Sequence, residues 1–370
     1  MISDERCSLF DDRRKVLVEK VLYPRISPME KAYRILILGA GIAGLSCAKY
    51  LIENEIEDFL IIESNGEIGG RCQTIDESIE LGADMFHGQT SNNPLYDLAE
   101  QNHLIEQIDE YERDNCYHDE NGQSIDEDLI NEIKEIFDEI LEKKIPTYPY
   151  ENYPDISLGE FLSTELNDYL QVTRAALDDD EINQREKVID WFSKQHSCLN
   201  MIGCEKLIDV SVQGWNSFER LSTKIDERVY VKGGLVNFLK RIFLEKIPMK
   251  HIQLNTIVRR IHIHENQGYV SVEIVRKNRE MQVYHVKHLV CTQSIGCLKQ
   301  TMHEMFDPPL PYTKRLAIDK LGFGTVNRVY LIFSKPFWDV DFNSFHFLWS
   351  RNTKWKLNCL EKTPYDVSLI

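Results

Sequence analysis

The residues with the clearest chemistry in this sequence are three glycines. Gly39, Gly41 and Gly44 form a G-x-G-x-x-G pattern. The pattern follows a continuous apolar run, Tyr33–Leu38, and opens a stretch with helical spacing, Ile42–Glu53. A turn between a buried strand and a helix presents unpaired backbone N–H groups and the positive end of the helix dipole, and both attract phosphate. In this context the pattern predicts a turn that binds the pyrophosphate of a dinucleotide.

Each position in such a turn has its own requirement. Gly39 permits the tight turn, Gly41 lets the backbone approach the pyrophosphate, and Gly44 lets helix and strand pack closely. Glu63 ends a second buried run, Phe59–Ile62, about 20 residues further on, where a carboxylate accepts the ribose hydroxyls. The alternative is a glycine turn in an α/β domain that binds no ligand. This alternative does not explain why strand, turn, helix and acid all occur at the spacing of a dinucleotide-binding unit.

A second group of residues distinguishes two kinds of dinucleotide. Gly69, Gly70 and Arg71 lie just past the acid. They offer further backbone N–H groups and a guanidinium to the same pyrophosphate. This arrangement favours FAD over NAD, and it argues against an NAD-dependent dehydrogenase.

Composition limits the partners and the compartment. The chain has 370 residues and a formal net charge of −17, which favours two domains and argues against nucleic acid, although a cationic small molecule remains compatible. No apolar run approaches the roughly 18 residues that span a bilayer. The nine cysteines are an odd number without a C-x-x-C pair, which favours a reducing compartment. We therefore expect a cytoplasmic protein, with the nucleus as the alternative, that binds neither nucleic acid nor membrane. The sequence leaves its oligomeric state open.

The hydrophobic period changes along the chain. Residues 97–220 are mostly helical in pattern, and the clearest helix is Asp126–Lys144, with a capping box expected at Ser124 and Glu127. Three runs then alternate with period two and predict an antiparallel meander: Ile257–His264, Tyr269–Arg276 and Met281–His285. A short apolar run, His288–Cys291, predicts a strand that returns to the parallel sheet.

Together these motifs resemble the flavin-dependent amine oxidases, and most of all their polyamine (spermine) oxidase branch. The resemblance runs from about Tyr33 to Trp349 and rests on these segments: Ile37–Gly44, Glu63, Gly69–Arg71, Glu80–Gly88, Asn93–Tyr96, Val231–Leu235, Ile252–Ile261, Pro308–Pro311, Ala317–Thr325 and Lys335–Trp338.

The resemblance implies an α/β fold. An FAD-binding Rossmann-like domain with a three-stranded β-meander is expected beside a mixed α+β substrate domain. We expect an N-terminal extension over residues 1–32, a discontinuous FAD-binding domain over 33–96 and 228–300, and a substrate-binding domain over 97–227 and 301–370 whose C-terminal part is incomplete.

The resemblance also implies a reaction. A polyamine such as spermine, spermidine or an N-acetyl derivative loses a hydride to flavin N5, the imine hydrolyses, and O2 reoxidises the flavin with release of H2O2. His87 matches a histidine near the substrate amine, and Glu205 resembles an acid that faces a distal ammonium. The alternatives are a packing histidine and a surface acid. The cofactor contacts implied are Gly39, Gly41, Ala43, Gly44, Glu63, Gly70, Arg71 and Val258, the last on the adenine side of FAD.

Two departures from the family pattern define the competing hypothesis. Arg328 stands where the family has a lysine that holds a water against flavin N5, and arginine cannot act as a base. The sequence also reaches Ile370 without the family's glycine-rich C-terminal FAD segment. The alternative is therefore a truncated, non-catalytic relative that binds FAD or polyamine weakly or acts as an interaction partner. A histone lysine demethylase shares the chemistry, but its extra helical module and insertion are not expected here.

One further motif is a candidate metal site. His262 and His264 point to the same side of a predicted strand. Ile261 and Ile263 on the other side indicate an ordinary strand with one apolar and one polar face. We therefore predict no metal site.

Overall fold

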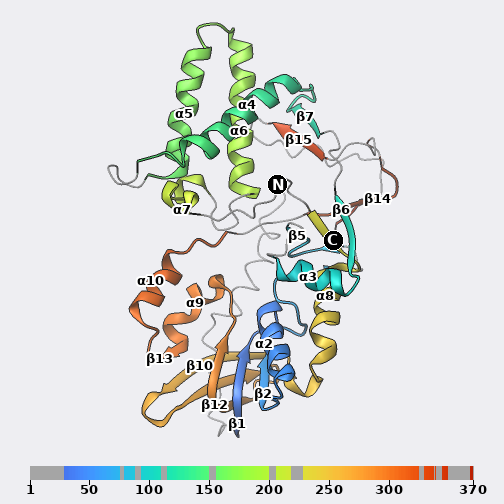
Figure 1. Cartoon of the computed structure of the whole chain (residues 1–370), viewed down its shortest axis with the longest axis vertical. Coiled ribbons are helices and arrows are strands. Elements are labelled where there is room, and N and C mark those ends of the chain that lie inside the picture. The colour runs from blue at the N-terminus through green and yellow to red at the C-terminus, as the bar shows by residue number, and fades with distance from the viewer. Residues whose placement is uncertain are drawn as a thin grey trace, which may run out of the picture. The chain divides into compact units, whose positions relative to one another are not determined.

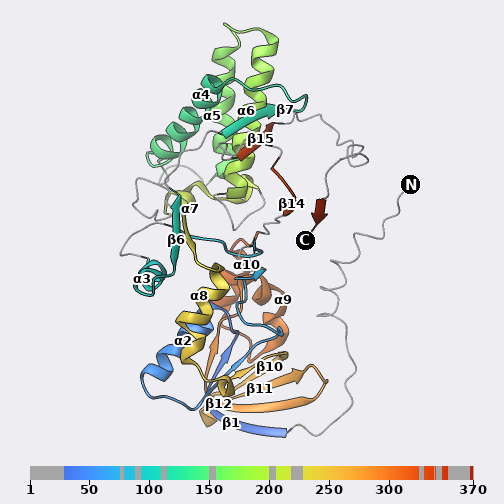
Figure 2. The same cartoon turned by 90° about the vertical axis from the view of Figure 1, so that its right-hand side faces the viewer.

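The computed structural model describes residues 29–75, 79–87, 93–109, 115–149, 156–199, 206–217, 228–324, 329–336, 338, 344–348 and 367–369. By its internal contacts the chain divides into two compact units (Figures 1 and 2). The first unit comprises Met1–Gln73 and Leu239–Arg315, and the second comprises Thr74–Phe238 and Leu316–Ile370. The domain boundaries expected from the sequence stay a prediction.

A seven-stranded sheet forms the centre of the first unit, in the order β13-β10-β11-β12-β1-β2-β9. Its strands are β1 Met29–Leu38, β2 Phe59–Ile62, β9 Ile252–Gln253, β10 Thr256–His264, β11 Tyr269–Arg276, β12 Met281–Cys291 and β13 Phe306–Asp307. Strands β12, β1, β2 and β9 run parallel, whereas β10, β11 and β12 pair antiparallel. The expected α/β fold with a parallel sheet and a meander is confirmed.

The strand bounds correct two details of the sequence analysis. The third meander strand and the returning strand are one continuous strand, β12. Strand β11 pairs with its residues Met281–Val286, and β1 pairs with its residues Gln282–Cys291. For the same reason β1 begins at Met29 and not at Tyr33, since Met29 already pairs with Gln282. Pairing between distant segments sets both limits, so local periodicity does not reveal them.

Helix α2 (Ile42–Glu53) follows the first parallel strand and packs on it. Its buried residues are Gly44, Leu45, Ala48 and Leu51. The strands beneath are apolar on both faces, as Leu36, Ile37 and Ile61 are fully buried. Full burial of one such aliphatic side chain stabilises a fold by about 1.5–3 kcal/mol, so this contact fixes the start of the helix relative to the strand ends.

The second unit is mainly helical in the described part of residues 97–220, as expected. Its helices are α3 Pro94–Gln101, α4 Glu127–Glu139, α5 Leu158–Thr173, α6 Asp179–Leu199 and α7 Val212–Asn216, with a π-helical turn over Ile140–Lys144. Its strands are β3 Thr74–Ile75, β4 Ile79–Glu80, β5 Phe86–His87, β6 Ile105–Asp109, β7 Asn115–Asp119, β8 Arg228–Val231, β14 Leu331–Phe333, β15 Ser344–Leu348 and β16 Val367–Leu369. The remaining helices are α8 Gly234–Ile242, α9 Ile295–Met305 and α10 Tyr312–Lys320.

The helices α4, α5 and α6 share one hydrophobic core, to which Ile133, Phe137, Leu162 and Val188 contribute. The capping box expected at the start of α4 is wrong, because the N-cap is Asp126, whose side chain accepts from the Asp128 amide. A capping box does occur at the start of α5, between Ser157 and Glu160. Over the described residues, no helix combines the length and apolar character needed to cross a membrane.

Candidate functional site

The carboxyl ends of β1, β2 and β12 meet at one edge of the sheet. The Gly39 amide donates to Ile62 O at 2.8 Å, and the Thr292 hydroxyl donates to Leu38 O at 2.7 Å. Gly39 has a φ of +108°, and a Cβ there would lie 2.7 Å from Thr292 Oγ1. Only glycine satisfies both the left-handed backbone and the close approach. The edge where parallel strands end is where open α/β sheets bind ligands.

The other two glycines of the turn differ in what surrounds them. A Cβ at Gly44 would lie 1.9 Å from Gly39 O, so the first turn of α2 closes directly on the glycine turn. Gly41 is the N-cap of α2, and a Cβ there would meet nothing closer than Gly69 O at 3.8 Å. Ala43 is exposed in the first turn of the helix. Gly44 is therefore required by packing, whereas a Cβ at Gly41 would make only ordinary van der Waals contacts.

Glu63 lies buried beside this turn, with 5% of its surface exposed. Its Oε2 accepts from the Ala40 amide at 2.8 Å, and its Oε1 accepts from the Asn65 amide at 2.9 Å and from the Ser64 hydroxyl at 3.1 Å. An ionised carboxylate has about four acceptor positions. Three donors therefore orient the group and leave acceptor capacity for a hydroxyl.

The second glycine pair packs against the first turn. The Gly69 amide donates to Ala40 O at 3.0 Å, and Gly41 and Gly69 form a parallel bridge. Gly70 has a φ of +60°, and a Cβ there would lie 3.4 Å from Gly41 Cα. Arg71 is exposed. The loop thus brings further backbone to the start of α2.

The start of β10 is held against the end of β2. The Thr256 amide donates to Glu63 O at 2.9 Å, and the Asn255 amide donates to Asn65 O at 2.8 Å. Val258, two residues into the strand, is half-buried and pairs with Ile274. The cofactor contacts predicted from sequence therefore come from one edge of one unit, although their roles toward FAD stay predictions.

Two residues at such helix and strand ends were missed by the sequence analysis. Thr292 carries no motif of its own, and its only signal is that it follows the apolar run His288–Cys291. Glu80 is buried and caps α8: its Oε1 accepts from the Leu235 amide at 2.5 Å, and its Oε2 accepts from Thr74 Oγ1 at 2.8 Å. A protein carboxylate therefore already occupies the start of α8.

The catalytic residues predicted from sequence fall largely outside the described residues. His87 ends β5, and its backbone pairs with Arg228 of β8, but its side chain is not among the described side chains. Glu205 and Arg328 lie outside the described residues. The predicted roles of all three stay predictions.

Two thiols of the first unit, on α2 and α9, are partly buried. Cys47 on α2 and Cys297 on α9 are half-buried. Burial raises the pKa of both thiols above the ordinary value, so both are protonated at neutral pH. The protonated thiol is a weak nucleophile, so neither Cys47 nor Cys297 is a candidate nucleophile.

The paired histidines of β10 are part of the polar face of the meander. His262 lies 3.1 Å from both Asp307 Oδ2 and Glu273 Oε1, and His264 Nε2 lies 2.9 Å from Ser271 Oγ. No group of three or more His, Cys, Asp or Glu side chains with the arrangement of a metal site occurs among the residues that the structure describes.

Residues 42–360 match the model of the flavin containing amine oxidoreductases. The chain belongs to this family. FAD is the family's cofactor, as the sequence analysis expected.

Individual relatives are more distant. The chain is 26% identical over 342 residues to the human peroxisomal N(1)-acetyl-spermine/spermidine oxidase, a match that covers 85% of this chain and 64% of that protein. It is 28% identical over 332 residues to the rice lysine-specific histone demethylase 1 homolog 2, covering 87% of this chain and 40% of that protein. The chain thus spans less than two thirds of the length of these relatives.

The fold is similar to that of a putrescine oxidase solved with bound putrescine. The TM-score is 0.56 at 18% identity, and the match covers 82% of this chain and 66% of the other. At this identity the likeness shows the fold alone.

The residues at the edge of the sheet fit FAD. A dinucleotide requires backbone without a side chain at Gly41, a helix start without a side-chain cap, and spare acceptor capacity at Glu63, and all three are present. The backbone of Gly39–Gly44 and Gly69–Gly70 would hold the pyrophosphate, and Glu63 would hold the ribose.

Proposed function

We propose that this protein carries out FAD-dependent oxidation of a polyamine: spermine, spermidine or an N-acetyl derivative. The observation that carries the proposal is the uncapped start of α2 beside the buried, pre-oriented carboxylate of Glu63. FAD, when bound, supplies a hydride acceptor at N5 for the carbon beside the amine nitrogen and is returned to its oxidised form by O2, with H2O2 as a product.

The chain's own residues bind, orient and handle protons. Backbone amides at the start of α2 hold phosphate oxygens, and Glu63 accepts from ribose hydroxyls. In this proposal His87 accepts a hydrogen bond from the substrate amine, which must be neutral to react. Glu205 pairs with a distal ammonium, and Arg328 holds a water by donating to it.

Two findings support a polyamine over other amines. The human relative is named for acetylated spermine and spermidine. The formal net charge of −17 attracts a polycation over long range. The proposal includes the cytoplasm as location, with the nucleus as the alternative, and fractionation of cells that express the tagged chain tests it.

The direct test uses the purified full chain. After reconstitution with FAD and removal of excess cofactor, we expect a bound flavin spectrum that bleaches anaerobically with spermine and recovers with O2, with one H2O2 per amine oxidised. Glu63→Gln weakens retention of FAD, whereas Glu67→Gln, an exposed acid four residues on, does not. A protein that retains no flavin contradicts the cofactor site.

The second candidate is a flavin-binding relative without turnover, and Arg328 is the observation that favours it. A bound flavin that no polyamine bleaches supports this candidate. Arg328→Lys separates the two: a gain in reoxidation rate by O2 with unchanged FAD retention assigns the defect to this position.

A further inference from the structure

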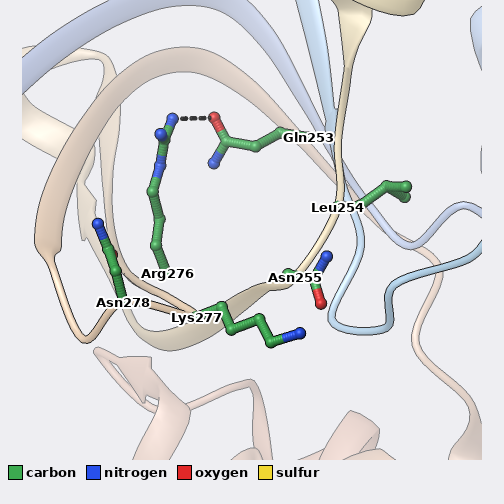
Figure 3. Close-up of a pocket in the computed structure, with 6 residues that line it drawn as sticks. All are labelled: Gln253, Leu254, Asn255, Arg276, Lys277 and Asn278. Atoms are coloured by element: carbon green, nitrogen blue, oxygen red, sulfur yellow. Dashed lines mark hydrogen bonds between the residues drawn. The ribbon is translucent and has the colours of Figure 1, made fainter.

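A cavity of about 240 Å³ lies between the start of β10 and the turn that joins β11 to β12 (Figure 3). Its lining residues are Gln253, Leu254, Asn255, Arg276, Lys277 and Asn278. None of them belongs to the glycine turn or to the second glycine pair. The cavity is nevertheless close to the acid of the candidate cofactor site, because the Glu63 amide donates to Gln253 O at 2.9 Å.

The charge at this cavity is opposite to that of the whole chain. The turn contributes Arg276, Lys277 and Arg279, three cations within four residues, to a protein with a net charge of −17. Lys277 and Arg279 are exposed, and Arg276 is half-buried. The carboxylate of Glu280 in the same turn accepts from the amides of Asn278 and Gln282.

The guanidinium of Arg276 is incompletely bonded. Its Nη2 donates to Gln253 Oε1 at 2.7 Å, the contact drawn in Figure 3. Its Nε is buried without a hydrogen-bond partner. Among the described residues no carboxylate forms an ion pair with it. A half-buried cation without a counterion is costly unless an anion compensates it.

The neutral partner of Arg276 is fixed in place by a second bond. Gln253 Oε1 also accepts from the Tyr284 hydroxyl at 2.8 Å, and Tyr284 is fully buried. The acceptor of the guanidinium is therefore oriented by the protein itself, which lowers the entropy cost of ordering Arg276.

We infer that this cavity binds a phosphate group, held by Arg276 and Lys277 with the side-chain amides of Asn255 and Asn278 as further donors. The pocket of about 240 Å³ has room for several water molecules and therefore for a phosphate group. Arginine and lysine together with neutral amides suit a tetrahedral oxyanion. Its lining residues differ from those that would hold the pyrophosphate, and the inference goes beyond the proposed oxidase function.

The test measures phosphate binding to the flavin-loaded full chain. Thermal unfolding and calorimetric titration are run with inorganic phosphate at constant ionic strength, with chloride as the reference salt. Phosphate is expected to raise the melting temperature of the wild type. Arg276→Gln weakens its binding on the order of 10- to 100-fold, the loss of a charge-assisted hydrogen bond. Arg34→Gln, which removes an exposed arginine of β1, leaves the affinity unchanged.

A second variant and two further ligands test the inference independently. Lys277→Gln changes an exposed side chain and folds normally, and it weakens phosphate several-fold even if Arg276→Gln does not fold. Glycerol 3-phosphate binding with equal affinity identifies a phosphomonoester as an acceptable source, and weaker binding restricts the site to free phosphate. Acetate that stabilises the protein more than phosphate overturns the inference, as does phosphate binding that is absent or unaffected by both cavity variants.

Discussion

Two helices in this protein begin after glycines, and their first turns are used in opposite ways. Gly41 caps α2 without a side chain, and a Cβ at this position would meet only ordinary contacts. At α8, the Glu80 carboxylate accepts from the Leu235 amide, and a Cβ on Gly234 would lie 2.5 Å from Thr74 Cγ2. The first turn of α2 has no side-chain cap and can bind a ligand, whereas the first turn of α8 is already bound by a protein carboxylate.

This difference shows that glycine before a helix does not by itself identify a phosphate site. Whether the helix start can bind phosphate depends on which backbone amides the nearest buried carboxylate accepts from. Glu63 bonds to the Ala40 amide, one residue before the N-cap, and leaves the first turn of α2 uncapped. Glu80 bonds within the first turn of α8 and satisfies it. A free helix start with its dipole is the better anion site.

The largest expected effect separates two glycines of the same turn. Gly44→Ala places a Cβ 1.9 Å from Gly39 O and should lower the free energy of unfolding by about 3 kcal/mol or more. Gly41→Ala, with its nearest contact at 3.8 Å, should lower it by less than about 1 kcal/mol and yet weaken FAD binding. Urea unfolding and flavin titration measure the two quantities. Equal stability of the two variants would contradict the packing role of Gly44.

Removal of the acid at α8 should affect stability without affecting the cofactor. Glu80→Ala leaves the Leu235 amide and the Thr74 hydroxyl without their acceptor, and we expect a loss of about 2 kcal/mol in the free energy of unfolding. Glu80→Gln keeps the shape and one acceptor, so its loss is smaller. Both variants should retain FAD at wild-type affinity. A loss of FAD at unchanged stability would show that α8, and not only α2, receives the ligand.

Removal of the acid at α2 should have the reverse outcome. Glu63→Gln replaces a carboxylate that accepts from Ala40 with an amide, and FAD affinity should fall about tenfold, or roughly 1.4 kcal/mol. The loss in stability without FAD should be smaller than that of Glu80→Ala, since Ser64 and Asn65 lie at the solvent side of the group. Calorimetric titration of the apo-protein with FAD checks the first value, and urea unfolding checks the second.

The smallest expected effect concerns a third carboxylate that accepts backbone amides. Burial tends to raise the pKa of Asp119, but hydrogen bonds from the Gln123 and Asn121 amides, with Lys187 nearby, lower the pKa overall. A lowered folded-state pKa gives stability that is present above the unfolded value, near 3.9, and is lost as the pH falls through the folded value. The stability difference between wild type and Asp119→Asn should therefore shrink below about pH 4. A stability difference that is constant from pH 7 to pH 3 would contradict a stabilising role of the ionised Asp119 carboxylate.

Local patterns predicted the part of the site that is local in sequence. The run from β1 through the glycine turn to Glu63 is one β-α-β unit, so hydrophobic periodicity and glycine spacing are enough to place it. Thr292 reaches Leu38 from 254 residues away, and Glu80 reaches Leu235 from 155 residues away. Neither residue has a neighbour in the sequence that signals its partner.

The remaining differences have the same origin. Long-range pairing extends β1 to Met29 and merges two expected strands into β12. Asp126 caps α4 in place of Ser124 because the Ile125 amide donates to Tyr117 O, which holds residue 125 outside the helix. Alternation and capping motifs describe what a segment prefers, and tertiary contacts decide where it begins and ends.

Strand β12 links two regions of the first unit without a break. Its 11 residues connect the turn that carries Arg276 and Lys277 to Thr292, whose hydroxyl donates to Leu38 O at the glycine turn. Strand β11 pairs with its first half, Met281–Val286, and β1 pairs with it from Gln282 to Cys291. The meander and the nucleotide edge are therefore consecutive parts of one strand, and a change in the register of β12 would alter both.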